Sequence, residues 1–165
     1  MELRSKIRIG VLGPADCSPE AYSFAREVGF LIGRAAALLV CGGRGGVMEA
    51  AAKGAKEAGG ITIGILPGDR EADANPYIDI PIVTGMGNAR NAINVLTSHA
   101  VIAIEGSYGT LSEIALALKC RVPVIGLKTW DISVPGGAPL PICLAQSPEE
   151  AVGEALKAAK KRGQV

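Results

Sequence analysis

The sequence predicts an α/β domain with a mainly parallel, doubly wound sheet of about six or seven strands and helices on both faces. Short apolar, β-branched runs alternate along the chain with longer stretches whose apolar residues recur at helical spacing. Several of these runs end directly in glycine-rich turns that precede a helical stretch. The composition is 48% hydrophobic but only 4% aromatic, so we expect an aliphatic core.

The length and the charge narrow the class of protein. A chain of 165 residues is expected to form one domain over 1–165. The 17 basic and 16 acidic residues leave a net charge of +1, which argues against a nucleic-acid-binding surface. The charged start, residues 1–8, does not resemble a secretory signal, and no apolar run is long enough to span a membrane.

The cysteines give a further expectation about the compartment. No two of them have the spacing of metal ligands, so we expect four free thiols in a reducing cytoplasm: Cys17, Cys41, Cys120 and Cys143. We expect an exposed acidic loop at Asp69, Glu71 and Asp73. Their spacing lacks the glycine and the distal glutamate of a calcium-binding loop. The sequence therefore predicts no metal site and no resident cofactor.

Apolar runs predict the strands, and each is short enough for a buried parallel strand. They cover residues 7–13, 38–41, 61–66, 80–84, 100–104, 122–127 and a shorter run at 142–144. Residues 131–141 are rich in proline and glycine and are expected to form an exposed loop.

Capping signals and helical spacing predict the helices between these strands. Ser18-Pro19-Glu20 and Ser147-Pro148-Glu149 each combine an N-cap serine with a proline at the first helical position. The helix from Val47 has a face of alanine and glycine, which predicts a very close approach to the sheet. A helix over 88–98 is expected to turn four apolar residues inward: Ala89, Ala92, Ile93 and Leu96.

Residues 100–118 carry the first candidate site, in the order strand, glycine turn and helix. Unpaired N–H groups and the helix dipole at such a helix start attract a phosphate. The ligand-binding candidates here are Gly106, Ser107, Tyr108, Gly109 and Thr110. Glu113 is expected to point away from the apolar stripe of this helix, where a carboxylate could handle protons or a sugar hydroxyl. Alternatively, Thr110 and Glu113 form a capping box that only stabilises the helix start.

Two further glycine turns follow strands and are expected at the same edge of the sheet. The first glycine turn, Gly42 to Gly46, supplies the candidates Gly42, Gly43, Gly45 and Gly46. The second glycine turn, Gly85 to Gly87, supplies Met86. Neither turn has the spacing of a dinucleotide fingerprint or a Walker loop, so a mononucleotide or a phosphorylated sugar fits better than NAD or ATP. Alternatively, the first turn has glycines only because its backbone needs positive φ, and Arg90 is a surface arginine.

Three segments, in the same order, resemble the Lonely Guy proteins, which are phosphoribohydrolases often mislabelled as lysine decarboxylases. They are Gly42-Gly43-Arg44-Gly45-Gly46-Val47-Met48, Gly85-Met86-Gly87-Asn88-Ala89-Arg90-Asn91 and Gly106-Ser107-Tyr108-Gly109-Thr110-Leu111-Ser112-Glu113. The resemblance implies a Rossmann-like homodimer that cleaves the N-glycosidic bond of a nucleoside 5′-monophosphate to a base and ribose 5-phosphate. It also implies Arg90 and Glu113 as the catalytic pair and the third segment as the phosphate loop.

Two departures from the family motif suggest a different branch. Glu105 stands in place of the motif's proline and Ser107 in place of its second glycine, and an added carboxylate would repel a phosphate. The chain is also similar to the molybdenum cofactor carrier proteins, which bind rather than hydrolyse. The sequence thus leaves two expectations open, a phosphoribohydrolase and a non-catalytic carrier or sensor of a nucleotide or molybdenum-cofactor-like phosphate ligand.

Other expectations hold for both functions. No pyridoxal phosphate pocket with a Schiff-base lysine can be identified, which argues against a lysine decarboxylase. We expect a small phosphorylated ligand, a dimer or a dimer of dimers, and neither a nucleic acid nor a membrane as a partner.

Overall fold

The protein forms one seven-stranded, all-parallel sheet, which confirms the predicted fold class. A computed structural model describes residues 6–162, so the expectation of no secretory signal in residues 1–8 falls largely outside this range. The strands lie in the order β4-β3-β2-β1-β5-β6-β7. Their bounds are β1 Arg8–Leu12, β2 Leu38–Cys41, β3 Ile61–Leu66, β4 Ile80–Val83, β5 Ala100–Ile104, β6 Val124–Leu127 and β7 Ile142–Ala145.

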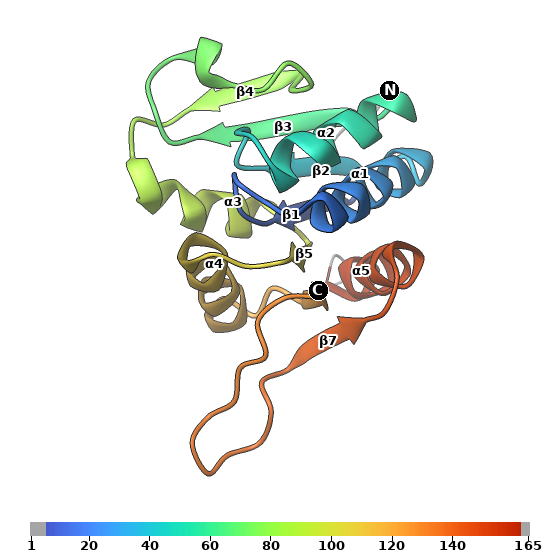
Figure 1. Cartoon of the computed structure of the whole chain (residues 1–165), viewed down its shortest axis with the longest axis vertical. Helices are drawn as coiled ribbons and strands as arrows, with labels where there is room; N and C mark the ends of the chain where they lie inside the picture. Colours follow the sequence, from blue (N-terminus) through green and yellow to red (C-terminus); the bar gives the residue numbers. More distant parts are fainter. Residues whose placement is uncertain (1–5, 163–165) are drawn as a thin grey trace.

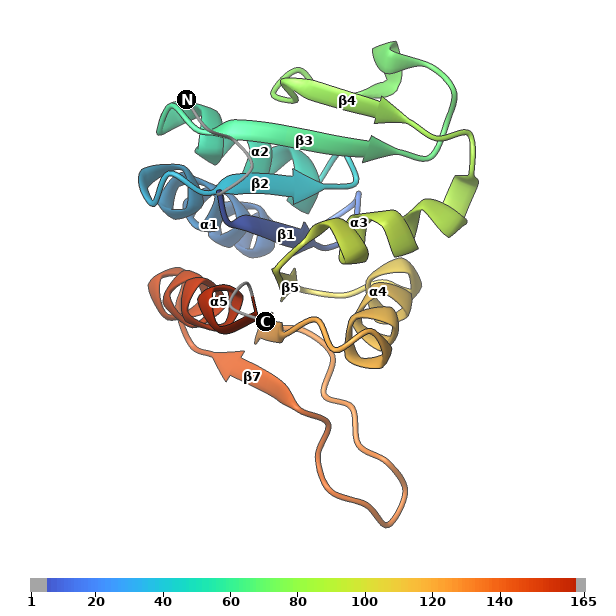
Figure 2. The same ribbon diagram turned by 180° about the vertical axis from the view of Figure 1, so that it is seen from behind.

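Helices cover both faces of this sheet (Figures 1 and 2). One face carries α1 Pro19–Arg34, α2 Val47–Glu57 and α5 Pro148–Arg162, and the other carries α3 Asn91–Thr97 and α4 Tyr108–Lys119. Two short 3₁₀ helices, η1 Glu71–Asp73 and η2 Gly87–Arg90, lie in the connections on either side of β4. Within residues 6–162, no helix is both long and apolar enough to cross a membrane.

The direction of winding reverses between β1 and β5, which are neighbours in the sheet. From β1 the chain winds outward through β2 and β3 to β4, and from β5 it winds the other way to β7. In sheets of this kind, ligands bind beyond the carboxyl ends of the strands at such a reversal. Because all strands are parallel, the turns after β1, β2, β4 and β5 lie at one edge of the sheet.

The closest helix packing joins α1 to α2. A Cβ added to Gly54 would lie 1.8 Å from the carbonyl oxygen of Arg26, and one added to Gly29 would lie 1.9 Å from that of Ala51. The sequence predicts a very close approach of the alanine and glycine face of α2 to the sheet. The structure shows that its glycine serves the contact with α1 instead.

The predicted inward face of the helix over 88–98 is wrong. This segment begins as η2 and continues as α3, whose buried side chains are Asn91, Asn94 and Val95. Leu96 is 59% exposed. The reason is that α3 packs against α4 through polar contacts: Asn94 Nδ2 donates to Glu113 Oε1 at 2.8 Å and Asn91 Nδ2 donates to Ser112 Oγ at 3.1 Å.

Candidate functional site

The turn after β5 leads directly into α4. Ser107 is the N-cap, and its backbone N–H donates to Thr110 Oγ1 at 3.4 Å. The helix thus begins one turn earlier than the predicted Thr110–Glu113 capping box, and that interpretation is wrong. Ser107, Tyr108 and Gly109 are all exposed, so the N–H groups of Tyr108 and Gly109 face the solvent side of this edge, whereas Thr110 is buried and forms a capping box with Ser107. This is the geometry that binds an anion.

The expectation that Glu113 points away from the core side of its helix is wrong, because Glu113 lies on the buried face of α4 together with Thr110, Ile114 and Ala117, beside α3. The side chain is only 6% exposed, and its Oε1 accepts the hydrogen bond from Asn94. Burial raises the pKa of the Glu113 carboxyl, while the Asn94 hydrogen bond and the positive charge of Arg90 act in the opposite direction. The carboxylate is therefore part of the α3–α4 contact.

Arg90 is half-buried, so the alternative interpretation of this residue as a surface arginine is wrong. Its guanidinium lies against the first glycine turn, where a Cβ on Gly42 would come within 2.1 Å of Arg90 Nη1. Burial lowers the pKa of Arg90, and the charge of Glu113 acts in the opposite direction. The structure thus brings together Gly42, Arg90 and Glu113 from three segments far apart in the sequence.

The first glycine turn has a conformation that only glycine adopts easily. Gly43 and Gly46 have φ values of +70° and +62°, and a Cβ on Gly46 would lie 2.4 Å from the carbonyl oxygen of Pro14. Gly45 is half-buried, and Met86, in the turn before η2, is exposed. A tight strand-to-helix turn therefore explains Gly43 and Gly46 by itself, and the approach of Arg90 explains Gly42.

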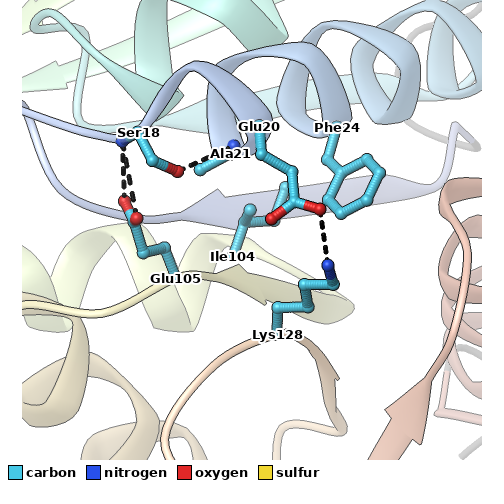
Figure 3. Close-up of a pocket in the computed structure, with 7 residues that line it drawn as sticks. All are labelled: Ser18, Glu20, Ala21, Phe24, Ile104, Glu105 and Lys128. Atoms are coloured by element: carbon cyan, nitrogen blue, oxygen red, sulfur yellow. Dashed lines mark hydrogen bonds and ion pairs between the residues drawn. The ribbon is translucent and has the colours of Figure 1, made fainter.

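Glu105 points toward the start of α1. Both oxygens of its carboxylate face the backbone N–H of Ser18, at 3.4 and 3.3 Å, beside a hollow of about 160 Å³ that also contains Phe24 and Lys128 (Figure 3). The positive end of the α1 dipole stabilises this charge. Glu105 has a φ of +54°, which a proline cannot adopt, so the family's proline would not fit here. The second departure is also accommodated, because Ser107 has an extended backbone and caps α4.

Sequence reasoning missed Asn94 and Trp130. Trp130 lies in the loop after β6, where its Nε1 donates to the carbonyl oxygen of Ser107 at 3.3 Å and its ring stacks on Tyr108. The signals were present, because Trp130 is the only tryptophan and Asn94 follows Asn91 at a helical spacing of three. Asn94 was overlooked because the apolar pattern of residues 88–98 pointed to another face.

Comparisons with known proteins show which family the chain belongs to. The family model described as "SLOG cluster4 family" matches residues 6–157. The solved molybdenum cofactor binding protein from Rippkaea orientalis is 43% identical with a TM-score of 0.85, and the alignment covers 92% of this chain and 96% of that one. The molybdenum cofactor carrier protein from Chlamydomonas reinhardtii is 40% identical with a TM-score of 0.83, covering 94% and 99%.

A curated relative extends the likeness to another organism. An uncharacterized protein of Archaeoglobus fulgidus is 43% identical over 155 residues, which is 94% of this chain and 98% of the relative. The matches thus run over nearly the full length of both partners. This chain belongs to the SLOG cluster4 family.

Proposed function

We propose that the protein binds and carries a phosphorylated heterocyclic ligand of the molybdenum-cofactor type without cleaving it. The main observation in support of this proposal is the burial of Glu113, which is 6% exposed and whose carboxylate accepts a hydrogen bond from Asn94. A general acid or base must come within hydrogen-bond reach of its substrate. A carboxylate that joins two helices supports binding better than hydrolysis.

The phosphate group of the ligand would lie at the start of α4. The N–H groups of Tyr108 and Gly109 lie in the exposed first turn of the helix, and the exposed Ser107 adds a hydroxyl. The buried Thr110 would hold this turn in place through its capping box with Ser107. Gly106 would keep the backbone turn compact, and Arg90 would add a positive charge from the direction of the first glycine turn, Gly42 to Gly46. Met86, exposed before η2, would contact the ligand's outer part.

One observation favours a phosphoribohydrolase as the second candidate. Arg90 and Glu113, the pair that the family resemblance implies as catalytic, come close enough for each charge to alter the pKa of the other. A carboxyl whose pKa is raised by burial is also typical of catalytic acids. In this alternative, Glu113 would activate water and Arg90 would stabilise the departing charge.

Incubation of the purified protein with AMP separates the two functions. We expect no free adenine by chromatography from either the parent or Glu113→Gln, and we expect mass spectrometry of the purified protein to find a pterin phosphate together with molybdenum. Release of adenine by the parent that is lost in Glu113→Gln would establish the hydrolase instead.

A second experiment tests the phosphate site. Gly109→Glu fits sterically, because an added Cβ would lie 3.6 Å from Ser107 Oγ, but it places a negative charge where the phosphate is expected. We expect it to abolish binding of phosphorylated ligands in calorimetry. Gly153→Glu makes the same charge change in open space on α5 and should bind as the parent does.

We further propose a homodimer in the cytoplasm. The register places Ile61, Ile63, Ile80 and Ile82 on the face of the sheet that carries α3, and we call these four residues the isoleucine face. Ile80 and Ile82 are 43% and 41% exposed, and no helix lies over this end of the sheet in Figure 2. A second copy would cover it. The four free cysteines support a reducing compartment.

A further inference from the structure

Two aromatic side chains meet on the surface beside the start of α4. Tyr108 is the first residue of α4 and is 85% exposed, and Trp130 comes from the loop after β6. Their ring centroids lie 6.4 Å apart with an angle of 27° between the planes. Tyr108 is exposed, whereas Trp130 is half-buried and packs on one side against the apolar cluster beneath α4.

Trp130 is fixed to the same loop that offers its N–H groups to a phosphate. Its Nε1 donates to the carbonyl oxygen of Ser107 at 3.3 Å. A Cβ on Gly106 would lie 2.4 Å from Nε1, so the glycine leaves the space that the indole fills. A ligand phosphate at the start of α4 and a ring on this aromatic pair would therefore be neighbours.

Polar groups for the edge of such a ring lie next to the indole. Trp130 lines a hollow of about 210 Å³ together with Lys128, Asp131, Leu144 and Gln146. Asp131 and Gln146 are exposed, so their side chains are free to accept from amino groups and, for Gln146, to donate to an oxo group. Leu144 adds an apolar contact.

From this arrangement we infer that the Tyr108–Trp130 pair is the subsite for the planar ring of the ligand, and that the ring is a fused bicycle with amino and oxo groups. Pterins and guanine share this chemistry, because both contain a 2-amino-4-oxopyrimidine ring. Aromatic side chains stack on such rings with little dependence on their exact identity, and edge contacts then select among them. This inference rests on the proposed phosphate site at the start of α4.

Binding of GMP, of ribose 5-phosphate and of inorganic phosphate tests the inference by calorimetry. GMP adds the ring to a phosphate that the other two also have, so we expect GMP to bind at least ~10-fold more tightly than ribose 5-phosphate. Because Trp130 is the only tryptophan, a ring that stacks on it should also quench the intrinsic fluorescence, and ribose 5-phosphate should not.

Variants of the pair separate ring binding from phosphate binding. Tyr108→Ala should weaken GMP at least ~5-fold and leave ribose 5-phosphate unchanged, whereas Tyr108→Phe keeps a ring and should bind as the parent does. Trp130→Ala should act in the same way, and the exposed Tyr108 serves as the test if the Trp130 variant fails to fold.

The possible failures differ from one another. If GMP and ribose 5-phosphate bind equally, or if Tyr108→Ala leaves GMP binding unchanged, the ring subsite is wrong while the phosphate site stands. If none of the three phosphorylated probes binds, the proposed phosphate site is wrong and the ring subsite with it.

Discussion

At the scale of single residues, two buried polar atoms lie beside Glu113 without a protein partner. Among the described residues, Arg90 Nε and Asn94 Oδ1 have no hydrogen bond. A buried polar atom that stays unpaired costs about 1–3 kcal/mol, so structures rarely retain one without a reason. One is a donor and the other an acceptor, and both belong to side chains that contact the candidate site. This pattern agrees with a site whose polar groups are completed by something other than the protein.

Cysteine reactivity is the first prediction at this scale. Burial raises the pKa of the Cys41 thiol to about 11, so almost none of it is thiolate at pH 8, and Cys143 is exposed. We expect maleimide to label Cys143 rapidly and Cys41 only after unfolding, as read by peptide mass spectrometry. Cys143→Ser should remove the rapid label. Labelling of Cys41 in the native protein at the rate of Cys143 would contradict the buried position.

A second prediction concerns His99, which lies between α3 and β5. Both ring nitrogens face N–H donors of Arg8: the backbone amide lies 3.1 Å from Nδ1 and the guanidinium 3.0 Å from Nε2. A protonated ring has no lone pair to accept either hydrogen bond. Burial and the charges of Arg8 and Arg162 lower the pKa of His99 below its usual value of 6.5.

The sign of the pH dependence follows from this lowered pKa. As the pH falls below 6.5, the unfolded chain takes up the proton before the folded one, so the free energy of unfolding decreases. NMR titration of His99 should give a midpoint below 6.5. His99→Asn keeps an acceptor near the Arg8 amide but does not titrate, so its stability should fall less between pH 7 and pH 5. An equal loss in both proteins would contradict the assignment.

At the scale of elements, the sequence was sufficient to predict where a helix begins if its first turn is capped by nearby residues. Ser18 caps α1 as expected, with its Oγ accepting from the Ala21 N–H at 3.1 Å, and Ser147 accepts from the N–H of Glu150 at the start of α5. The inward face of α3 was not predictable in this way. Its burial is decided by Glu113 on another helix, and a polar pair across two helices leaves no apolar pattern in either.

Glycine substitutions test the packing between α1 and α2. Gly54→Ala brings a Cβ within 1.8 Å of the Arg26 carbonyl oxygen, so the helices must separate and we expect a loss of about 1–3 kcal/mol in the free energy of unfolding. Gly153→Ala, in open space on α5, should instead raise it by up to about 1 kcal/mol, because alanine restricts the unfolded chain. Denaturant unfolding of both variants measures the difference. Changes of the same sign would show that Gly54 is not a close contact.

At the scale of the whole molecule, the alternation of strands and helices was sufficient to predict a parallel sheet and to place the glycine turns at one edge. The strand order required the structure, because all strands are similar apolar runs whose order leaves no local signal. The approach of Arg90 to Gly42 depends on that order, since η2 follows the outermost strand β4 and reaches back to the turn after β2. Residue types thus predicted candidates, and topology decided which of them meet.

The open end of the sheet also bears on assembly. Pro81 lies in β4, the edge strand, where it has no N–H to offer on the free edge, so a neighbour cannot easily extend the sheet there. The isoleucine face is left for face-to-face packing, and the exposed Leu96 lies on α3, which covers part of the same side. A two-fold axis would bring this face onto its own copy, as in most homodimers.

Ile82→Asp tests the proposed dimer, because it places a charge in the isoleucine face. We expect the parent to sediment as a dimer at micromolar concentration and Ile82→Asp as a monomer, since an unpaired carboxylate in an apolar interface loses its hydration. The monomer should keep its fold, because Ile82 is already 41% exposed in the single chain. Val134→Asp makes a matched change at an exposed position of the loop after β6 and should remain dimeric. If the parent is a monomer at this concentration, or if Val134→Asp dissociates it as Ile82→Asp does, the isoleucine face is not the interface.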